Sequence, residues 1–275
     1  MVWTTVTDIN PIAWYKADAI TGLSDNDPID TWPDSSGNGI DLTQTSTARP
    51  LYKTGIVNGL PVARFDGSND YMSSGSFTLS TNVNVVVVYS LDLLKDYNSL
   101  VNMHDSATPA YMQKYINHHY YLNGTVLHGH NPTGTARFSQ RYANGQASVF
   151  KVDSYSQSVH TNTFQNFYRV NGNSSLGISG TAGTQTPATG TAYVHIGYSG
   201  LGGSYLNGDI AEIVIYEETS LNESVWLEGY LANKYGITLV DGHLFKNAPP
   251  DYAPATYNAA GGGVRQVNIR GGADQ

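Results

Sequence analysis

The sequence predicts an all-β domain, either a sandwich or a barrel, and three observations lead to this prediction. Only 13% of the 275 residues are charged, while the chain has 29 glycines and 20 tyrosines. Short runs of β-branched and aromatic residues recur between turn-forming residues, as in proteins built from many short strands. A single segment near the C-terminus has the periodicity of a helix. A chain of this length buries roughly three-quarters of its unfolded surface, so a large core is available.

Charge and composition exclude several classes of function. A formal net charge of −8 with scattered Lys and Arg leaves no basic stripe for a phosphate backbone, so we expect no nucleic-acid partner. The absence of cysteine excludes disulfides, zinc–thiolate sites and thiol catalysis. No apolar run approaches the ~20 residues of a membrane helix, and the N-terminus lacks the features of a secretory signal. We therefore expect no membrane partner and synthesis in the cytoplasm.

The first strand is predicted at residues 12–16 and is followed by an acidic, turn-rich loop. Two interpretations of this loop stay open. Its side chains either bond their own backbone or hold a calcium ion, which prefers oxygen ligands, through Asp25 and Asp27. The regular spacing of an EF-hand loop is missing, which favours the first interpretation. Calcium is the metal ion that suits this loop, and for the chain as a whole we expect no cofactor.

The middle of the chain predicts further strands. Residues 62–72 indicate two strands around the turn at residues 66–69, a hairpin signal. Residues 83–90 are nearly continuous in valine, which is typical of a strand covered on both faces in the middle of a sheet. Later strands are predicted at residues 100–104, 147–159, 167–171 and 193–198, with a Gly/Ser/Thr-rich loop at residues 172–190.

Residues 115–130 hold the largest number of histidine and tyrosine side chains suited to binding a ligand or a metal ion. If Asn123 and Gly124 make a two-residue turn, His119 is opposite His128. The candidate glycan-binding residues on the resulting shared face are Asn117, His119, Tyr121, His128 and His130. Three interpretations stay open: a solvated row of histidines, a sugar-binding groove with tyrosine stacking, or a Zn²⁺ or Ni²⁺ site. All depend on the register, because a shift of one residue moves each side chain to the other face.

The clearest secondary structure is a strand at residues 209–216 followed by a helix. Ser220 and Glu223 have the spacing of a capping box, and Gly236 supplies the left-handed residue that ends the helix. Asp209 and Glu212 lie at the wrong spacing for an acid pair on one strand face. We expect Asp209 to fix a turn and Glu212 to bond a neighbouring loop.

After Val240 the chain becomes rich in proline and glycine. This composition predicts a domain of residues 1–240 and an extended C-terminal arm of residues 241–275. Residues 264–269 alternate in polarity, as does a segment that adds a strand to a partner's sheet. The expected partner-binding residues of the arm are Val264, Arg265, Val267 and Ile269.

The order of these segments resembles the laminin-G-like, concanavalin A-like lectin and glucanase domains of bacteriophage and bacterial surface proteins. The resemblance covers residues 10–239 and depends mainly on RFDGSNDY, GDIAEIVIY and LNESVWLEGYLANKYG. It implies a two-sheet antiparallel jelly-roll sandwich with a terminal helix that packs back across it. Such domains mostly bind glycans. Glucanase members carry an E-x-D-x-(x)-E run, which this chain lacks, so we expect no enzyme and no catalytic residue.

These expectations combine into one functional hypothesis. The protein is expected to be a non-enzymatic structural protein of a bacteriophage virion, either capsid-decorating or tail-associated, with glycan binding as an added property. Its arm is expected to bind other virion subunits in a homo-oligomer at the virion surface. The alternatives are an extracellular carbohydrate-binding adhesin module of a bacterial surface protein and, less favoured, a glycoside hydrolase.

Overall fold

The computed structural model describes most of the chain up to residue 250. The described ranges are 5–79, 83–93, 98–104, 116–120, 125–130, 137–142, 148–160, 163–173, 190–200, 205–217, 221–247 and residue 250. In the ranges 116–142 and 156–168 the description concerns the backbone alone. The C-terminal residues Val264, Arg265, Val267 and Ile269 lie outside the described part, so their expected role in partner binding stays a prediction.

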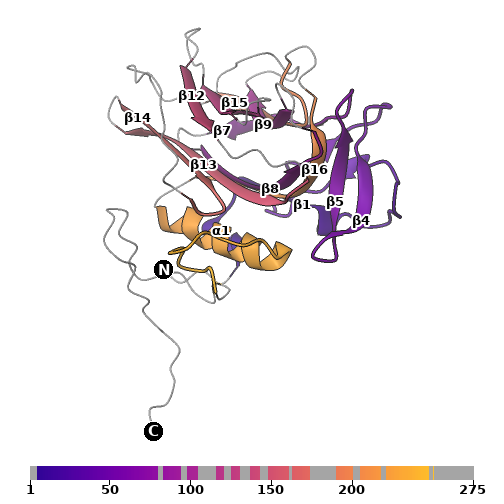
Figure 1. Ribbon diagram of the computed structural model, residues 1–275. Coiled ribbons are helices and arrows are strands. Elements are labelled where there is room, and N and C mark those ends of the chain that lie inside the picture. The colour runs from indigo at the N-terminus through magenta and orange to yellow at the C-terminus, as the bar shows by residue number, and fades with distance from the viewer. Residues whose placement is uncertain are drawn as a thin grey trace.

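The described strands form two antiparallel sheets that face each other, which confirms the predicted all-β sandwich (Figure 1). The seven-stranded sheet has the order β14-β13-β8-β16-β5-β4, with β1 paired to β16. Its strands are β1 (Ala13–Lys16), β4 (Leu51–Val57), β5 (Leu60–Asp66), β8 (Val83–Leu91), β13 (Lys151–His160), β14 (Thr163–Val170) and β16 (Asn207–Tyr216).

The nine-stranded sheet lies opposite it, in the order β12-β11-β10-β9-β15-β6-β3-β2 with β7 paired to β15. Its strands are β2 (Thr31–Trp32), β3 (Leu42–Thr43), β6 (Met72–Ser74), β7 (Phe77–Leu79), β9 (Asn98–His104), β10 (Ile116–Tyr120), β11 (Thr125–His130), β12 (Arg137–Tyr142) and β15 (Gly190–Ile196). The helical elements of the described chain are η1 (Val6–Ile9), η2 (Ala17–Ala19) and α1 (Leu221–Tyr235).

Two hydrophobic clusters hold the layers together. The first fills the space between the sheets and includes Trp32, Phe65 and Met72. The second lies between the seven-stranded sheet and α1, which covers the side of that sheet that faces away from the nine-stranded sheet (Figure 1). Three layers result, with the seven-stranded sheet in the middle.

Strand β8 confirms the interpretation of its valine run. Val85 and Val87 belong to the cluster between the sheets, while Val86 and Val88 belong to the cluster under α1. All nine residues of β8 are buried, as expected for a strand covered on both faces.

Helix α1 also forms as predicted. Val225, Leu227 and Leu231 are buried in the cluster beneath it, and Gly236 has the left-handed conformation with φ +66°. Ser220, the expected N-cap, lies outside the described residues. The part of the chain that the structure describes includes no helix long and apolar enough to cross a membrane.

Residues 237–246, here called the strap, follow the helix and pack against it. Leu239 and Phe245 belong to the cluster under α1, and His243 is buried. The N–H of Val240 donates to the carbonyl of Asn171 at 3.0 Å, which joins the strap to the end of β14. The packed part of the chain therefore continues past the boundary expected at Val240.

The turn at residues 66–69 does not make the expected hairpin. Strand β5 pairs with β4 and β16, whereas β6 pairs with β3 and β15 of the other sheet. Asp66 Oδ1 accepts the N–H groups of Ser68 and Asn69, and Asp70 Oδ2 accepts the N–H of Asp66. The local turn chemistry was identified correctly, but the turn carries the chain from one sheet to the other.

Candidate functional site

The predicted histidine group is divided by the observed register. In the β10–β11 pair His118 is opposite His128, and His119 is opposite Leu127. The expected pairing of His119 with His128 is wrong by one residue, because the connection between Tyr120 and Val126 is longer than a two-residue turn. Tyr121 lies outside the described residues. By strand alternation, His128 and His130 share one face of the sheet with His118, whereas Asn117 and His119 belong to the opposite face.

The acidic loop has a structural task at the edge of the seven-stranded sheet. Asp25 Oδ2 is 2.9 Å from Lys53 Nζ, and Asp25 Oδ1 accepts the N–H of Thr54 at 2.9 Å. The hydrogen bond from Lys53, followed by that from Thr54, lowers the pKa of Asp25. The carboxylate of Asp27 accepts the N–H of Ser24 at 2.7 Å. Within the described ranges no group of three or more His, Cys, Asp or Glu side chains is placed to hold a metal ion.

Asp209 and Glu212 have other partners than expected. Asp209 is opposite Arg64 on β5 and accepts two hydrogen bonds from its guanidinium, at 2.7 and 2.8 Å. Burial raises the pKa of Asp209, and Arg64 offsets part of that effect. Glu212 is buried and contacts β1 and α1 rather than a loop.

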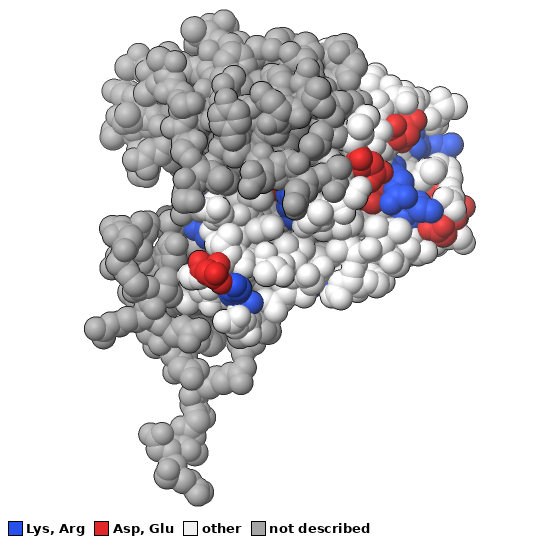
Figure 2. Space-filling view, in the orientation of Figure 1, with Lys and Arg blue, Asp and Glu red and all other residues white. Residues whose placement is uncertain are grey.

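Figure 2 shows that charged side chains gather at the right of the view, over the region of β4 and β5 in Figure 1.

A row of polar residues crosses the outer face of the nine-stranded sheet. Trp32, Leu42, Met72 and Val194 point into the core between the sheets, so the residues that alternate with them point outward. The register aligns these outward positions from strand to strand. The members of this polar row are Thr31, Thr43, Ser73, His195 and Asn102.

The polar row is exposed at one end and buried at the other. Thr31 and Thr43 are exposed, whereas His195 and Asn102 are fully buried. Ser73 Oγ and His195 Nδ1 are 2.7 Å apart. Asn102 Nδ2 donates to the backbone carbonyl of Tyr198 at 3.1 Å. Asn102 Oδ1 is buried and accepts no hydrogen bond from any residue that the structure describes.

Three tyrosines, here called the tyrosine cluster, lie at the end of the polar row. The rings of Tyr198 and Tyr205 are stacked with centroids 4.4 Å apart, and the ring of Tyr71 is 6.1 Å from that of Tyr198. All three side chains are partly exposed. Burial, followed by the neighbouring Tyr205 hydroxyl, raises the pKa of Tyr198, so the phenol stays neutral and can donate a hydrogen bond.

Gly197 fixes the position of this cluster. It has φ +86°, and a Cβ at this residue would come within 2.7 Å of the Phe65 ring. The N–H of Leu206 donates to the Gly197 carbonyl at 2.8 Å, which holds these two residues together. The members of the tyrosine cluster are distant in the chain, so their proximity could not be predicted from the sequence; the local signal was the Gly-rich segment beside Tyr198.

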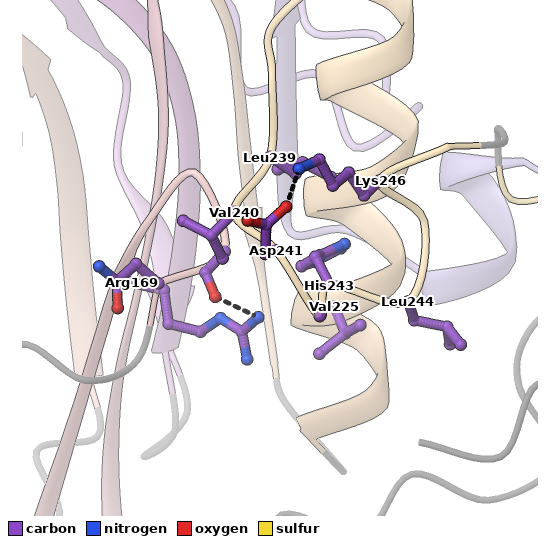
Figure 3. A pocket seen from close by; sticks show the side chains of 11 residues that line it. Arg169, Val225, Leu239, Val240, Asp241, His243, Leu244 and Lys246 are labelled. Atoms are coloured by element: carbon purple, nitrogen blue, oxygen red, sulfur yellow. Dashed lines mark hydrogen bonds and ion pairs between the residues drawn. The ribbon is translucent and has the colours of Figure 1, made fainter. Parts of the chain in front are cut away.

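A cavity of about 720 Å³ lies between the strap, the end of β14 and α1 (Figure 3). Two lining residues contact the buried carboxylate of Glu228: Arg169 Nε is 2.8 Å from its Oε1, and His243 Nε2 is 3.0 Å from its Oε2. His243 Nδ1 accepts the N–H of Phe245 at 3.1 Å. Arg169 also donates to the carbonyl of Gly172 at 2.9 Å. Internal partners thus engage these buried polar groups, and we assign the cavity to the attachment of the strap.

Comparisons with known proteins give fold-level similarity alone. No protein-family model and no curated protein sequence matches the chain. Trypanosoma rangeli sialidase in complex with sialic acid has a TM-score of 0.48 and 14% identity, over 82% of this chain and 33% of the sialidase. Domain 4 of an extracellular arabinanase from Geobacillus stearothermophilus, in complex with arabinotriose, has a TM-score of 0.45 and 15% identity over 75% of this chain and 92% of that domain.

A third solved structure is the carbohydrate-binding module of a Ruminococcus gnavus sialidase bound to α2,3-sialyllactose. It has a TM-score of 0.43 and 14% identity over 63% of this chain and 95% of the module. The chain spans about a third of the sialidase chains that it matches. We draw no functional inference at these TM-scores and identities. Since no family model matches, the resemblance to laminin-G-like and bacteriophage domains stays an expectation.

Proposed function

We propose that the protein is a carbohydrate-binding domain whose ligand lies on the outer face of the nine-stranded sheet. The observation that carries this proposal is the tyrosine cluster, whose three rings are partly exposed, beside the accessible hydroxyl groups of the polar row. A sugar ring has an apolar C–H face and a rim of hydroxyl groups. Partly exposed phenol rings accept the apolar face, and amide and hydroxyl groups bond the rim.

The proposed site favours neutral sugars. The polar row and the tyrosine cluster consist of Thr, Ser, His, Asn and Tyr side chains, with no carboxylate, Lys or Arg. Glycoside hydrolysis needs two carboxylates on either side of the scissile bond, so the members of this site do not supply that chemistry. We accordingly propose binding without catalysis, which is checked by chromatography of each bound oligosaccharide after incubation with the protein.

The binding test uses a glycan array followed by titration calorimetry of the best neutral oligosaccharide. Tyr198→Ala is expected to weaken binding at least about fivefold, taking as a guide the about 1–3 kcal/mol that stacking of a planar ligand on one aromatic ring contributes. Tyr230→Ala is the matched control, because Tyr230 is a partly buried tyrosine of α1, stacked on Trp226 in the helix layer. An equal loss in both variants, or no loss in Tyr198→Ala, contradicts the proposed position.

The predicted hairpin residues provide the alternative position on the same sheet. His119→Ala and Tyr121→Ala are measured beside Tyr198→Ala in the same titration. Loss of binding in these two variants alone would move the site to the β10–β11 hairpin. Loss in Tyr198→Ala alone supports the tyrosine cluster.

The biological setting that we propose is the surface of a bacteriophage virion, with a bacterial surface adhesin as the alternative. This setting is supported by the resemblance of the segment order and by the Pro/Gly-rich composition of residues 251–275. Attachment to other subunits through residues 264–269 is part of this proposal. A binding assay between purified particles and the chain, with and without residues 251–275, tests the setting independently of glycan binding.

A further inference from the structure

A second recess lies apart from the polar row and the tyrosine cluster. It is a groove of about 640 Å³ lined by four segments: residues 9–12, residues 38–40, residues 75–78 and Glu217. Its volume is within the range of small-ligand sites. None of the polar-row or tyrosine-cluster residues lines it, so a ligand there is bound independently of the first site.

The floor of the groove is apolar and fixed in position. Ile12, Ile40 and Phe77 are partly buried and pack against the core between the sheets. Each therefore keeps part of its apolar surface accessible while its position is held by the core. A fixed, partly exposed phenyl ring is suited to the C–H face of a sugar.

The walls of the groove present hydrogen-bond acceptors. Asn38 Nδ2 donates to the carbonyl of Pro11 at 3.0 Å and to that of Ile12 at 3.0 Å. These two bonds use both amide hydrogens and fix the carboxamide, which leaves Asn38 Oδ1 as an acceptor for a ligand. Glu217 adds an exposed carboxylate where β16 ends, and Ser76 and Thr78 add hydroxyl groups.

The charge of the groove selects among ligands. Glu217 is the one charged side chain among the described lining residues, and no Lys or Arg accompanies it. A carboxylate accepts strong hydrogen bonds from hydroxyl groups but repels acidic sugars. The groove thus suits a sugar with an apolar face and several hydroxyl donors, and it disfavours uronic and sialic acids.

We propose that this groove is a second binding site for neutral carbohydrate at the end of the sandwich. The inference rests on the proposed function for its class of ligand but not for its location. Two separate sites on one domain let it hold two chains of a glycan surface at once, which raises the overall avidity beyond that of either site.

The test follows the backbone amide signals of the full chain by NMR during titration with cellotriose, chitotriose and trigalacturonate. The two neutral probes are expected to shift the amides of Gly39, Ser76 and Thr78, and trigalacturonate is expected to leave them unshifted. Glu217→Gln is expected to raise at least tenfold the dissociation constant that the shifts of the groove amides report. Asp241→Asn, which changes an exposed carboxylate on the strap, is the charge-matched control.

Gly75→Trp is the blocking variant. A Cβ at Gly75 meets no atom within 4 Å, so a large side chain is accepted there without a clash at its base and fills the groove. This variant is expected to abolish the shifts at Gly39 and Thr78 and to preserve those at Gly197 and Tyr198. The far-ultraviolet circular dichroism spectrum checks that it is folded.

The outcomes separate this inference from the proposed function. If Tyr198→Ala removes every shift while Gly75→Trp removes none, the groove inference is overturned and the proposed function stands. Groove shifts that persist in Tyr198→Ala and vanish in Gly75→Trp support the second site. If neither neutral probe shifts either region of the wild-type chain, both proposals fail. Groove shifts of equal size with trigalacturonate overturn the predicted selectivity.

Discussion

Glu212 is a buried carboxylate whose hydrogen-bond donors come from separate parts of the chain. Its Oε1 accepts from Trp14 Nε1 at 2.6 Å, and its Oε2 accepts from Lys234 Nζ at 2.7 Å and from the Tyr235 hydroxyl at 2.8 Å. Burial, followed by the Glu212 charge, raises the pKa of Tyr235, so its hydroxyl stays protonated and donates. A single side chain thus joins β1 and β16 to α1.

Replacement of Glu212 is expected to be strongly destabilising. Glu212→Ala should lower the free energy of unfolding by about 3–5 kcal/mol, because it leaves donors buried opposite no acceptor. Urea denaturation measures the change. Glu217→Ala, at the exposed residue that follows the same strand, is the control and should stay within about 0.5 kcal/mol of wild type. Similar losses in both variants would contradict the role assigned to Glu212.

Asp70 predicts a pH dependence of stability. Burial raises the pKa of Asp70 from 3.8 to about 6. The folded state therefore holds this proton more tightly than the unfolded state, and the contribution of Asp70 to stability falls as the pH rises from about 4 to about 6. At about 1.4 kcal/mol per pH unit, this loss is at most about 3 kcal/mol.

The Asp70→Asn variant isolates this effect. Its free energy of unfolding, measured in urea at several pH values between 4 and 7, should fall less with rising pH than that of the wild type. Asp30→Asn, which removes an exposed carboxylate paired with Arg49, should retain the wild-type slope. If the Asp70→Asn and wild-type slopes are parallel, the raised pKa is not linked to folding.

At the scale of elements, the acidic loop protects the free edge of β4. The N–H of Tyr52 donates to the Asp27 carbonyl, and the Tyr52 carbonyl accepts from the N–H of Asn26, both at 2.8 Å. The side chain of Asp25 accepts the N–H of Thr54, which lies two residues after Tyr52 on the same edge of β4. An edge strand with free N–H and C=O groups pairs readily with another chain, and this loop occupies those groups.

Asp25→Ala is expected to promote self-association of the folded protein. The variant frees the N–H of Thr54 and removes the carboxylate partner of Lys53, whose Nζ keeps its hydrogen bond to Asn26 Oδ1. Size-exclusion chromatography with light scattering at increasing concentration should show more association than in the wild type. Asp30→Ala serves as a control with an equal change in charge. Equal association of the two variants would show that net charge, and not the edge, is responsible.

The contact between α1 and the strap depends on one glycine. A Cβ at Gly229 would come within 2.5 Å of Phe245 Cβ, so Gly229 is the place where the Phe245 ring lies on the helix. In a helix alanine is favoured over glycine by about 1 kcal/mol. The clash and the helix propensity therefore act in opposite directions at this residue.

A double-mutant cycle separates these two effects. Gly229→Ala in the wild-type chain should be destabilising by about 1–3 kcal/mol, as expected for overpacking. In the Phe245→Ala background the same change should be neutral or stabilising, because the ring is gone and the propensity gain of about 1 kcal/mol remains. Urea denaturation of the four proteins gives the coupling energy. A coupling energy near zero would contradict the contact.

At the scale of the whole molecule, features set by local sequence were predictable and features set by distant pairing were not. The valine run of β8 and the end of α1 at Gly236 depend on neighbouring residues, and both were predicted correctly. The His119–His128 pairing was wrong because a register depends on the exact length of a connection. The tyrosine cluster could not be predicted, because the topology alone brings Tyr71 beside Tyr198.

The observed strap also changes where the chain should be cut to test the C-terminal arm. Deletion of residues 251–275 should leave the free energy of unfolding unchanged within about 0.5 kcal/mol, since the buried strap is retained. Deletion from Asp241 onward should be destabilising by several kcal/mol, because it removes Phe245 and the His243 partner of Glu228. Urea denaturation of both truncations measures this difference. Equal stability would show that the strap does not contribute to the folded domain.

The position of α1 makes the two outer sides of the sandwich different. The helix and the strap occupy the outer side of the seven-stranded sheet (Figure 1). On the other sheet, the residues of the polar row alternate with core residues and therefore face outward. The strap lies beside α1 (Figure 1). A support that binds the chain after the strap would therefore hold the domain by its helix side and leave the proposed sugar-binding face directed away from that support.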